Sequence, residues 1–128
     1  MSEKKRILVV DDEPDFCAIV QGQLEKEGFA VELAYDGVQG LEKVQANPPD
    51  AIVLDVMMPE MDGYEMCNKL KSDEKYADIP IILLTAVASH VTSTRYSHRD
   101  GMSTEADDYI AKPASAEEIA DSIKRLLD

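Results

Sequence analysis

The chain has 128 residues, enough for one domain of ordinary size, and 45% of them are hydrophobic, so it can bury a core and is not expected to be disordered. Its 26 acidic and 13 basic residues give a net charge of -13, which argues against direct binding to nucleic acid or to a membrane surface. The apolar run behind the basic residues 4–6 is too short for a signal peptide. We therefore expect a cytoplasmic protein in which Cys17 and Cys67 are reduced.

The first half of the chain alternates short apolar runs with amphipathic stretches, the pattern of a parallel sheet covered by helices. Residues 7–10 and 51–54 are continuously apolar, which predicts buried strands, whereas 30–34 alternates and is expected at an edge of the sheet. Helices are expected from Pro14 to Gly28 and at about 37–45. The first helix should bury one face, made of Phe16, Ile19, Val20 and Leu24.

The second half continues the alternation, with strands expected at 81–84 and 108–111 and helices at about 64–70 and 115–127. In the last helix, Ser115 and Glu118 have the spacing of a capping box. The chain is therefore predicted to be a single (βα)5 domain over residues 1–128, an α/β three-layer sandwich with parallel strands in the order 2-1-3-4-5.

Residues 86–106, between the fourth and fifth strands, fit this pattern least well. The stretch has few strong helix formers, its apolar residues are sparse, and Gly101 would interrupt a helix. His90 and His98 are eight residues apart without matching acids, so we interpret them as solvated loop residues. We expect a helix that is short, displaced or frayed, followed by a mobile loop of low stability that a partner could order.

Each predicted central strand is followed directly by polar side chains that could take part in chemistry. These side chains are Asp11 and Asp12, Asp55, Thr85, and Lys112. In the strand order 2-1-3-4-5, the winding reverses between strands 1 and 3, and open α/β sheets bind ligands at the carboxyl ends of the strands at this point. We therefore expect the acids to meet there, with Thr85 and Lys112 on the adjoining strands.

Converging carboxylates would repel one another unless a cation lay between them. Lys112 can neutralise one charge, and the remaining charge and the all-oxygen ligand set favour Mg²⁺. A divalent ion, Lys112 and Thr85 together can hold the oxygens of a phosphoryl group, with the central carboxylate, Asp55, as the nucleophile. Each residue alone has an ordinary explanation as a cap, turn or solvated charge, but the agreement of four placements favours a site.

The chain contains four ordered motifs, Ile7-Leu-Val-Val-Asp-Asp-Glu-Pro14, Leu54-Asp-Val-Met-Met-Pro59 with Met61-Asp-Gly63, Leu84-Thr-Ala86, and Asp107-Asp-Tyr-Ile-Ala-Lys-Pro113. With these motifs the chain resembles the receiver domain of bacterial response regulators. The match covers almost the whole chain. It implies a flavodoxin-like fold and a phosphorylation-dependent signalling switch, with Asp55 receiving a phosphoryl group from a histidine kinase or histidine phosphotransfer protein.

The resemblance also implies roles for single residues. Mg²⁺ would be held by Asp12, Asp55 and the backbone carbonyl of Met57, with Asp11 acting largely through water. Thr85 would contact the phosphoryl group, Lys112 would pair with it, and Tyr109 falls where the family carries its switch aromatic. Lys112-Pro113 falls where the family has a cis peptide. Glu13 is expected to point towards solvent near the start of the first helix.

The resemblance leaves the phosphoryl lifetime and the oligomeric state open. Met57 and Val87, two residues beyond Asp55 and Thr85, are apolar and offer no side chain to orient a water, which favours a long-lived phosphoryl group. The protein is expected to be a monomer or a phosphorylation-dependent dimer. The span of 27 residues from Thr85 to Lys112 is longer than is usual in the family, and the surplus lies where the family forms its fourth helix, part of its usual output surface.

Three other functions fit parts of the pattern. A haloacid-dehalogenase-type phosphatase would need an acid where Met57 stands, so we do not expect an enzyme that turns over a substrate. A flavodoxin would need phosphate-binding donors where the chain has Asp11-Asp12-Glu13. A receiver-like binding module that is never phosphorylated is opposed by the intact set of acids, Thr85 and Lys112.

Overall fold

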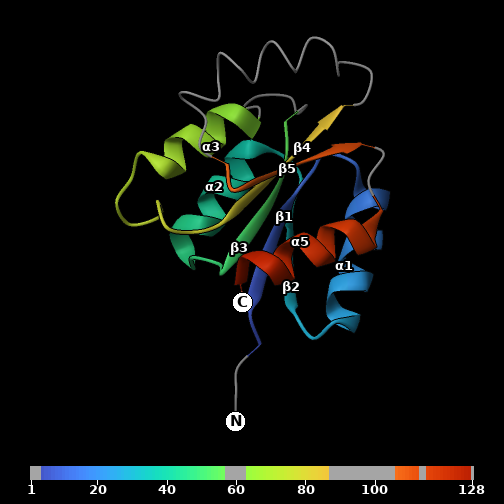
Figure 1. Ribbon diagram of the computed structural model, residues 1–128. Coiled ribbons are helices and arrows are strands. Elements are labelled where there is room, and N and C mark those ends of the chain that lie inside the picture. The colour runs from blue at the N-terminus through green and yellow to red at the C-terminus, as the bar shows by residue number, and fades with distance from the viewer. Residues whose placement is uncertain (1–3, 57–62, 87–105, 113–114, 128) are drawn as a thin grey trace.

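The computed structural model describes residues 4–56, 63–86, 106–112 and 115–127 (Figure 1). Strands and helices alternate along the chain, as the hydrophobic pattern predicts. The elements are β1 (Arg6–Val10), α1 (Pro14–Lys26), β2 (Ala30–Ala34), α2 (Gly37–Ala46), β3 (Ala51–Asp55), α3 (Gly63–Lys71), β4 (Ile81–Ala86), β5 (Asp108–Lys112) and α5 (Ala116–Leu127).

The five strands form one sheet in the order β2-β1-β3-β4-β5, and every neighbouring pair is parallel. The predicted order is therefore confirmed, with β2 at an edge. Helices α1 and α5 pack together on one face of the sheet, and α2 and α3 cover the other (Figure 1). The molecule is the three-layer sandwich that the sequence predicts.

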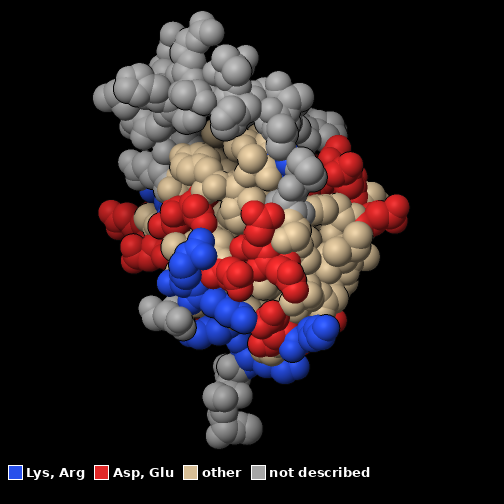
Figure 2. Space-filling view, turned by 45° about the vertical axis from the view of Figure 1, so that its right-hand side comes forward, with Lys and Arg blue, Asp and Glu red and all other residues tan. Residues whose placement is uncertain are grey.

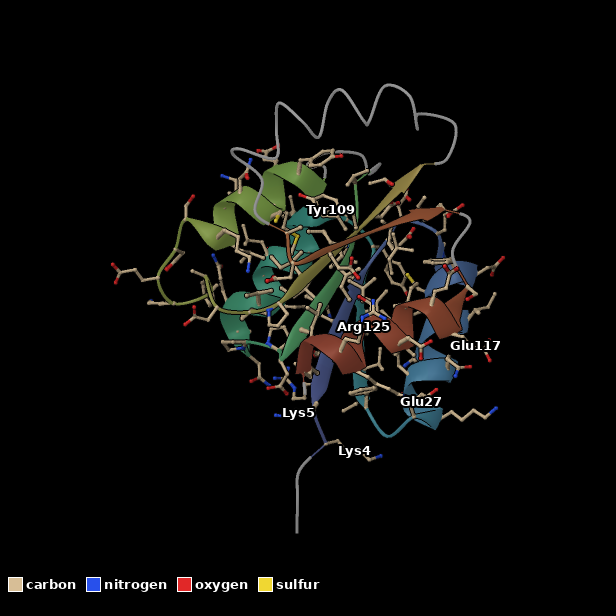
Figure 3. All side chains as sticks on the ribbon, viewed as in Figure 1. Lys4, Lys5, Glu27, Tyr109, Glu117 and Arg125 are labelled. Atoms are coloured by element: carbon tan, nitrogen blue, oxygen red, sulfur yellow. The ribbon has the colours of Figure 1, made fainter. Side chains whose placement is uncertain are left out.

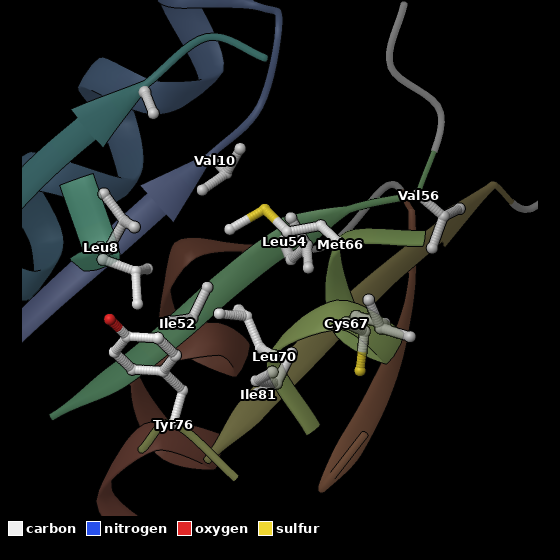
Figure 4. Close-up of a cluster of buried hydrophobic side chains, with 13 residues drawn as sticks. Leu8, Val10, Ile52, Leu54, Val56, Met66, Cys67, Leu70, Tyr76 and Ile81 are labelled. Carbon is white, nitrogen blue, oxygen red and sulfur yellow. The ribbon is translucent and has the colours of Figure 1, made fainter. Parts of the chain in front are cut away.

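Two hydrophobic clusters, one on each face of the sheet, hold the layers together. The cluster under α2 and α3 joins Leu8, Ile52 and Leu54 of the sheet to Met66 and Leu70 of α3 (Figure 4). These side chains are fully buried, and burial of each contributes about 1.5–3 kcal/mol. The central strands are thereby fixed in position, and with them the residues at their carboxyl ends.

Local signals in the sequence set the ends of several helices. Pro14 begins α1, where a missing N–H costs nothing, and Gly28, with a φ of 100°, stands in the left-handed conformation just past its end. Asp36 caps α2 by accepting from the N–H of Gln39 at 2.8 Å. The predicted capping box of α5 is confirmed, because Ser115 and Glu118 each accept a hydrogen bond from the other's backbone N–H.

The prediction that Ile19 of α1 belongs to the core is wrong. Ile19 is 63% exposed, whereas Cys17, Val20 and Leu24 are fully buried. These three follow a spacing of three and four residues and form the inner stripe of the helix, and Ile19 lies to one side of it. Phe16 packs only partly against the core.

The strands β3, β4 and β5 extend one or two residues beyond the apolar runs that predict them. Asp55, Thr85 and Lys112 still take part in the sheet, with Asp55 opposite Leu84 and Thr85 opposite Ala111. A polar side chain does not end the ladder, because the hydrogen bonds belong to the backbone. The predictions for residues 87–105, including the lengthened connection and both histidines, lie outside the described residues.

Candidate functional site

Residues from three different strands meet at the carboxyl edge of the sheet. Asp11 and Asp12 follow β1, and Asp55 ends β3 beside it. One carboxylate oxygen from each of these three residues lies within 4.8 Å of the others. Lys112, at the end of β5, reaches the same point. The structure therefore brings the predicted acids and the lysine together.

Two of the carboxylates are withdrawn from solvent. Asp11 is 0% exposed and Asp55 is 3% exposed, whereas Asp12 is exposed. One oxygen of Asp11 accepts from the backbone N–H of Glu13 at 3.0 Å, which fixes the turn between β1 and α1. Buried carboxylates are costly unless they are paired with positive charge and hydrogen-bond donors. Their partner is Lys112.

The ammonium of Lys112 stands among three carboxylates. Its Nζ lies 2.9 Å from Asp11 Oδ2, 3.2 Å from Glu13 Oε1 and 3.4 Å from Asp55 Oδ2. The ring of Phe16 adds a cation–π contact, with its centroid 4.8 Å from Nζ. The sequence did not predict that Glu13 and Phe16 contact Lys112, because it shows neither how close these residues lie to Lys112 nor which way their side chains point.

These contacts control the protonation of Lys112. Burial by itself would lower the pKa of Lys112, but the hydrogen bond to Asp11 and the charges of Asp55 and Asp11 outweigh burial and raise that pKa above its ordinary value. The stability linked to a raised lysine pKa is fully present below the ordinary value and is lost only as the pH rises through the folded pKa. Lys112 therefore remains a cation throughout the neutral range.

The prediction that Glu13 points towards solvent is only partly right. Its side chain is 66% exposed, yet Oε1 accepts a hydrogen bond from Lys112 at 3.2 Å. Glu13 is also the residue before the first turn of α1, and its side chain makes no capping hydrogen bond there. Its carboxylate is thus directed to the site and not to the helix.

Gly63 allows α3 to begin directly against the end of β3. Its N–H donates to the carbonyl of Val56 at 3.3 Å. A Cβ built on Gly63 would lie 2.5 Å from the backbone oxygen of Asp55 and 2.7 Å from Cα of Val56. No larger residue fits without moving backbone, so Gly63 helps to set the position of the Asp55 carboxylate.

Thr85 and Tyr109 occupy neighbouring strands near the site. Thr85 is opposite Ala111, and Tyr109, two residues earlier on β5, is opposite Leu83. Because side chains alternate along a strand, Thr85 and Tyr109 belong to the same face of the sheet, the one that α3 covers. Tyr109 is 40% exposed and lies in the upper half of Figure 3. Burial of its ring raises its pKa above the ordinary value.

Cys17 and Cys67 are not joined in a disulfide, as predicted for reduced thiols, and both are buried. The Cys17 thiol donates to the backbone oxygen of Asp11 at 3.3 Å. Burial, together with the charge of Asp11, raises the pKa of this thiol to about 11, so it stays protonated and unreactive. Met57 and Pro113, for which the sequence predicts a metal-binding carbonyl and a cis peptide, lie outside the described residues.

Comparison with known proteins shows the family of the chain. The family model of the response regulator receiver domain matches residues 7–124. The chain belongs to this family.

The curated relatives of this receiver domain are about twice its length. It is 44% identical to the response regulator MprA of Mycobacterium ulcerans over 95% of the chain and 50% of the relative. It is 38% identical to the DNA-binding dual master transcriptional regulator RpaA of Synechocystis, over 95% of the chain and 48% of the relative. The chain thus spans about half the length of the curated relatives it matches.

Solved structures show the same fold. The receiver domain of a histidine kinase from Syntrophus aciditrophicus has a TM-score of 0.85 at 35% identity, covering 96% of this chain and 89% of that one. The chemotaxis response regulator CheY4 of Vibrio cholerae has a TM-score of 0.85 at 30% identity, covering 98% of this chain and 100% of that one. These likenesses confirm the predicted flavodoxin-like fold.

The donor set of the site fits a small hard cation. Asp11, Asp12 and Asp55 present only oxygen ligands, and Lys112 neutralises only part of their charge. Carboxylates of this number and spacing suit Mg²⁺, which keeps water or phosphate oxygens as its other ligands.

None of the described helices combines the length and the hydrophobicity that a membrane-spanning helix needs.

Proposed function

We propose that this receiver domain is a phosphorylation-dependent switch whose phosphoacceptor is Asp55. The observation that carries the proposal is the position of this carboxylate. It ends the central strand β3, is 3% exposed, and has the Lys112 ammonium 3.4 Å away. A nucleophile held in this way faces the ligand-binding edge of the sheet with a cation beside it.

The reaction is transfer of a phosphoryl group from a phosphohistidine of a histidine kinase or histidine phosphotransfer protein. An oxygen of Asp55 forms a bond to phosphorus, the N–P bond breaks, and the histidine nitrogen keeps the bonding electron pair. The product is an acyl phosphate on Asp55. The domain is then a phosphoacceptor with slow autodephosphorylation and not an enzyme that turns over a separate substrate.

Other residues of the edge would hold the charge of the phosphoryl oxygens. Lys112 supplies an ammonium. Thr85 supplies a hydroxyl donor, and it directly follows Leu84, the β4 residue opposite Asp55. A Mg²⁺ ion would be held by Asp12, Asp55 and the Met57 carbonyl, with Asp11 acting through water. When bound, the ion offsets the negative charge of the carboxylates and of the phosphoryl group.

The signal would leave the site through Thr85 and Tyr109. The phosphoryl group attracts the Thr85 hydroxyl, which frees space on the α3 face for the Tyr109 ring to turn inward. A ligand shifts such an equilibrium only through contacts that differ between the two states, and the hydroxyl provides one. The same proposal places the protein in the cytoplasm, with a downstream protein or output domain as its target.

Intact-mass measurement after exposure to acetyl phosphate and Mg²⁺ tests the acceptor. The parent should gain one phosphate, Asp55→Asn should gain none, and the control Asp15→Asn, an exposed aspartate of α1, should behave like the parent. Labelling retained in Asp55→Asn would assign the acceptor elsewhere. No labelling of the parent would favour a binding module that is never phosphorylated.

A further inference from the structure

The ammonium of Lys112 has as many N–H donors as it has carboxylate neighbours. Lysine carries three donors, and Asp11, Glu13 and Asp55 lie 2.9, 3.2 and 3.4 Å from Nζ. The contacts to Asp11 and Glu13 are hydrogen bonds and the contact to Asp55 is a longer ion pair, so phosphoryl oxygens that bind Lys112 compete with these carboxylates for its donors. The question is which neighbour gives way.

Asp11 cannot leave without penalty. Its side chain is 0% exposed, its contact to Lys112 is the shortest of the three, and its other oxygen is held by the backbone N–H of Glu13. Without the ammonium, a buried charge would remain unpaired, which is far more costly than loss of an exposed contact. Asp55 is the acceptor itself, so its contact to Lys112 passes to the phosphoryl group that it carries. Any further phosphoryl oxygen on Lys112 has to displace Asp11 or Glu13.

Glu13 has the opposite properties. Its side chain is 66% exposed, so water can replace the ammonium at its carboxylate with little penalty. Its side chain makes no capping bond to α1, so its release does not disturb the helix. The ring of Phe16, 4.8 Å from Nζ, and the carboxylate of Asp11 still hold Lys112 after Glu13 has left.

We propose that Glu13 is a positioning residue that competes with the phosphoryl group for Lys112. The inference rests on the proposed phosphoacceptor function. In the resting state Glu13 occupies one donor of the ammonium and adds a negative charge next to the place where the phosphoryl oxygens will lie. Phosphorylation exchanges this exposed contact for a phosphoryl oxygen, so Glu13 weakens the phosphorylated state relative to the resting state.

The affinity for beryllofluoride, which mimics a phosphoryl group on an aspartate, measures this competition directly. In the presence of Mg²⁺, Glu13→Gln should bind beryllofluoride about two- to fivefold more tightly than the parent, the factor expected for an exposed ion pair. Asp15→Asn removes an equal charge from the first turn of the same helix, where the structure gives no ion pair with Lys112. This control should bind within about 1.5-fold of the parent, since screening weakens distant charges.

A double-mutant cycle separates competition for Lys112 from a general effect of charge. In a Lys112→Met background there is no ammonium to release, so Glu13→Gln should give no gain. An equal gain in Glu13→Gln and Asp15→Asn, or a gain that persists without Lys112, would overturn the inference while leaving Asp55 as the acceptor. A parent that binds no beryllofluoride would overturn both the proposed function and this inference.

Discussion

The amino edge of the sheet, where the strands begin, and the carboxyl edge, where they end, carry charge in different ways. At the amino edge, where the strands begin, charged side chains are matched to partners. Arg6 donates to Glu32 and to the carbonyls of Asn47 and Pro48, and its N–H donates to Asp50. At the carboxyl edge, by contrast, one ammonium faces several carboxylates. At the amino edge these contacts connect loops to strands. At the carboxyl edge an excess of negative charge remains, which can bind a cationic ligand.

Helix direction contributes to this difference. Each described helix runs back from the carboxyl edge to the amino edge, so the C-termini of these helices lie at the amino edge (Figure 1). Each described helix has a basic residue in its last turn, which suits the negative end of the helix dipole. In Figure 2, Lys and Arg side chains gather over the lower part of the face, near the start of β1. Lys4 and Lys5 mark the same end in Figure 3.

The comparison indicates which charges serve stability and which serve binding. A matched network at the amino edge should lose stability when one member is removed. An excess carboxylate at the carboxyl edge should do the reverse, because its removal relieves repulsion. A lysine and an aspartate substitution test this difference, and a glycine substitution tests how the carboxyl edge is positioned; they follow in order of decreasing expected effect.

The largest effect is expected for Lys71→Met at the amino edge. The Lys71 side chain is 10% exposed, and its Nζ donates to the carbonyls of Ala77 and Ile79 and to Asp107 at 2.9–3.0 Å. The same Asp107 oxygen accepts from the N–H of Ile81, so Lys71 joins α3 to the starts of β4 and β5. Its loss should lower the free energy of unfolding by about 2–3 kcal/mol in urea denaturation.

Lys69→Met is the matched control, since Lys69 is in the same last turn of α3 and has no ion pair among the described residues. It should change the free energy of unfolding by less than about 0.5 kcal/mol. If Lys71→Met were equally mild, the network at the amino edge would not stabilise the fold.

Gly63→Ala should come next, at about 2 kcal/mol of lost stability, because the added Cβ would lie 2.5 Å from the Asp55 carbonyl. The backbone must move where it positions Asp55, so phosphorylation by acetyl phosphate should also slow. Gly22→Ala is the control, because nothing lies within 4 Å of its added Cβ in α1. That substitution should stabilise the protein by up to about 1 kcal/mol. Equal unfolding free energies for the two variants would show that contact with β3 is unimportant.

The smallest effect is expected for Asp12→Ala at the carboxyl edge. Asp12 is exposed, and its carboxylate lies within 4.8 Å of those of Asp11 and Asp55. Without Mg²⁺ its removal should raise the free energy of unfolding by about 0.5 kcal/mol, the scale of an exposed charge interaction. The rise in Tm that Mg²⁺ gives the parent should be lost. Glu13→Ala should keep that rise, and Mg²⁺ responses like the parent's in both variants would contradict the proposed ligands.

Local and periodic signals in the sequence determined most of the fold. The continuous apolar runs predicted β1, β3 and β4, and the winding rule for parallel sheets gave the strand order. Caps such as Ser115 with Glu118 act between residues three apart, so the sequence displays them directly. The convergence of Asp11, Asp12, Asp55 and Lys112 was also predictable, because parallel strands bring their carboxyl ends to one edge.

Only the tertiary structure decided how the side chains meet within that edge. Glu13 and Phe16 contact Lys112 from 99 and 96 residues away in the chain, and no local pattern records this. The burial of Asp11, the exposure of Ile19 and the close approach of Gly63 to Asp55 likewise depend on how helices settle on the sheet. Packing between layers fixes side-chain positions to fractions of an ångström, whereas sequence periodicity shows only on which face of an element a side chain lies.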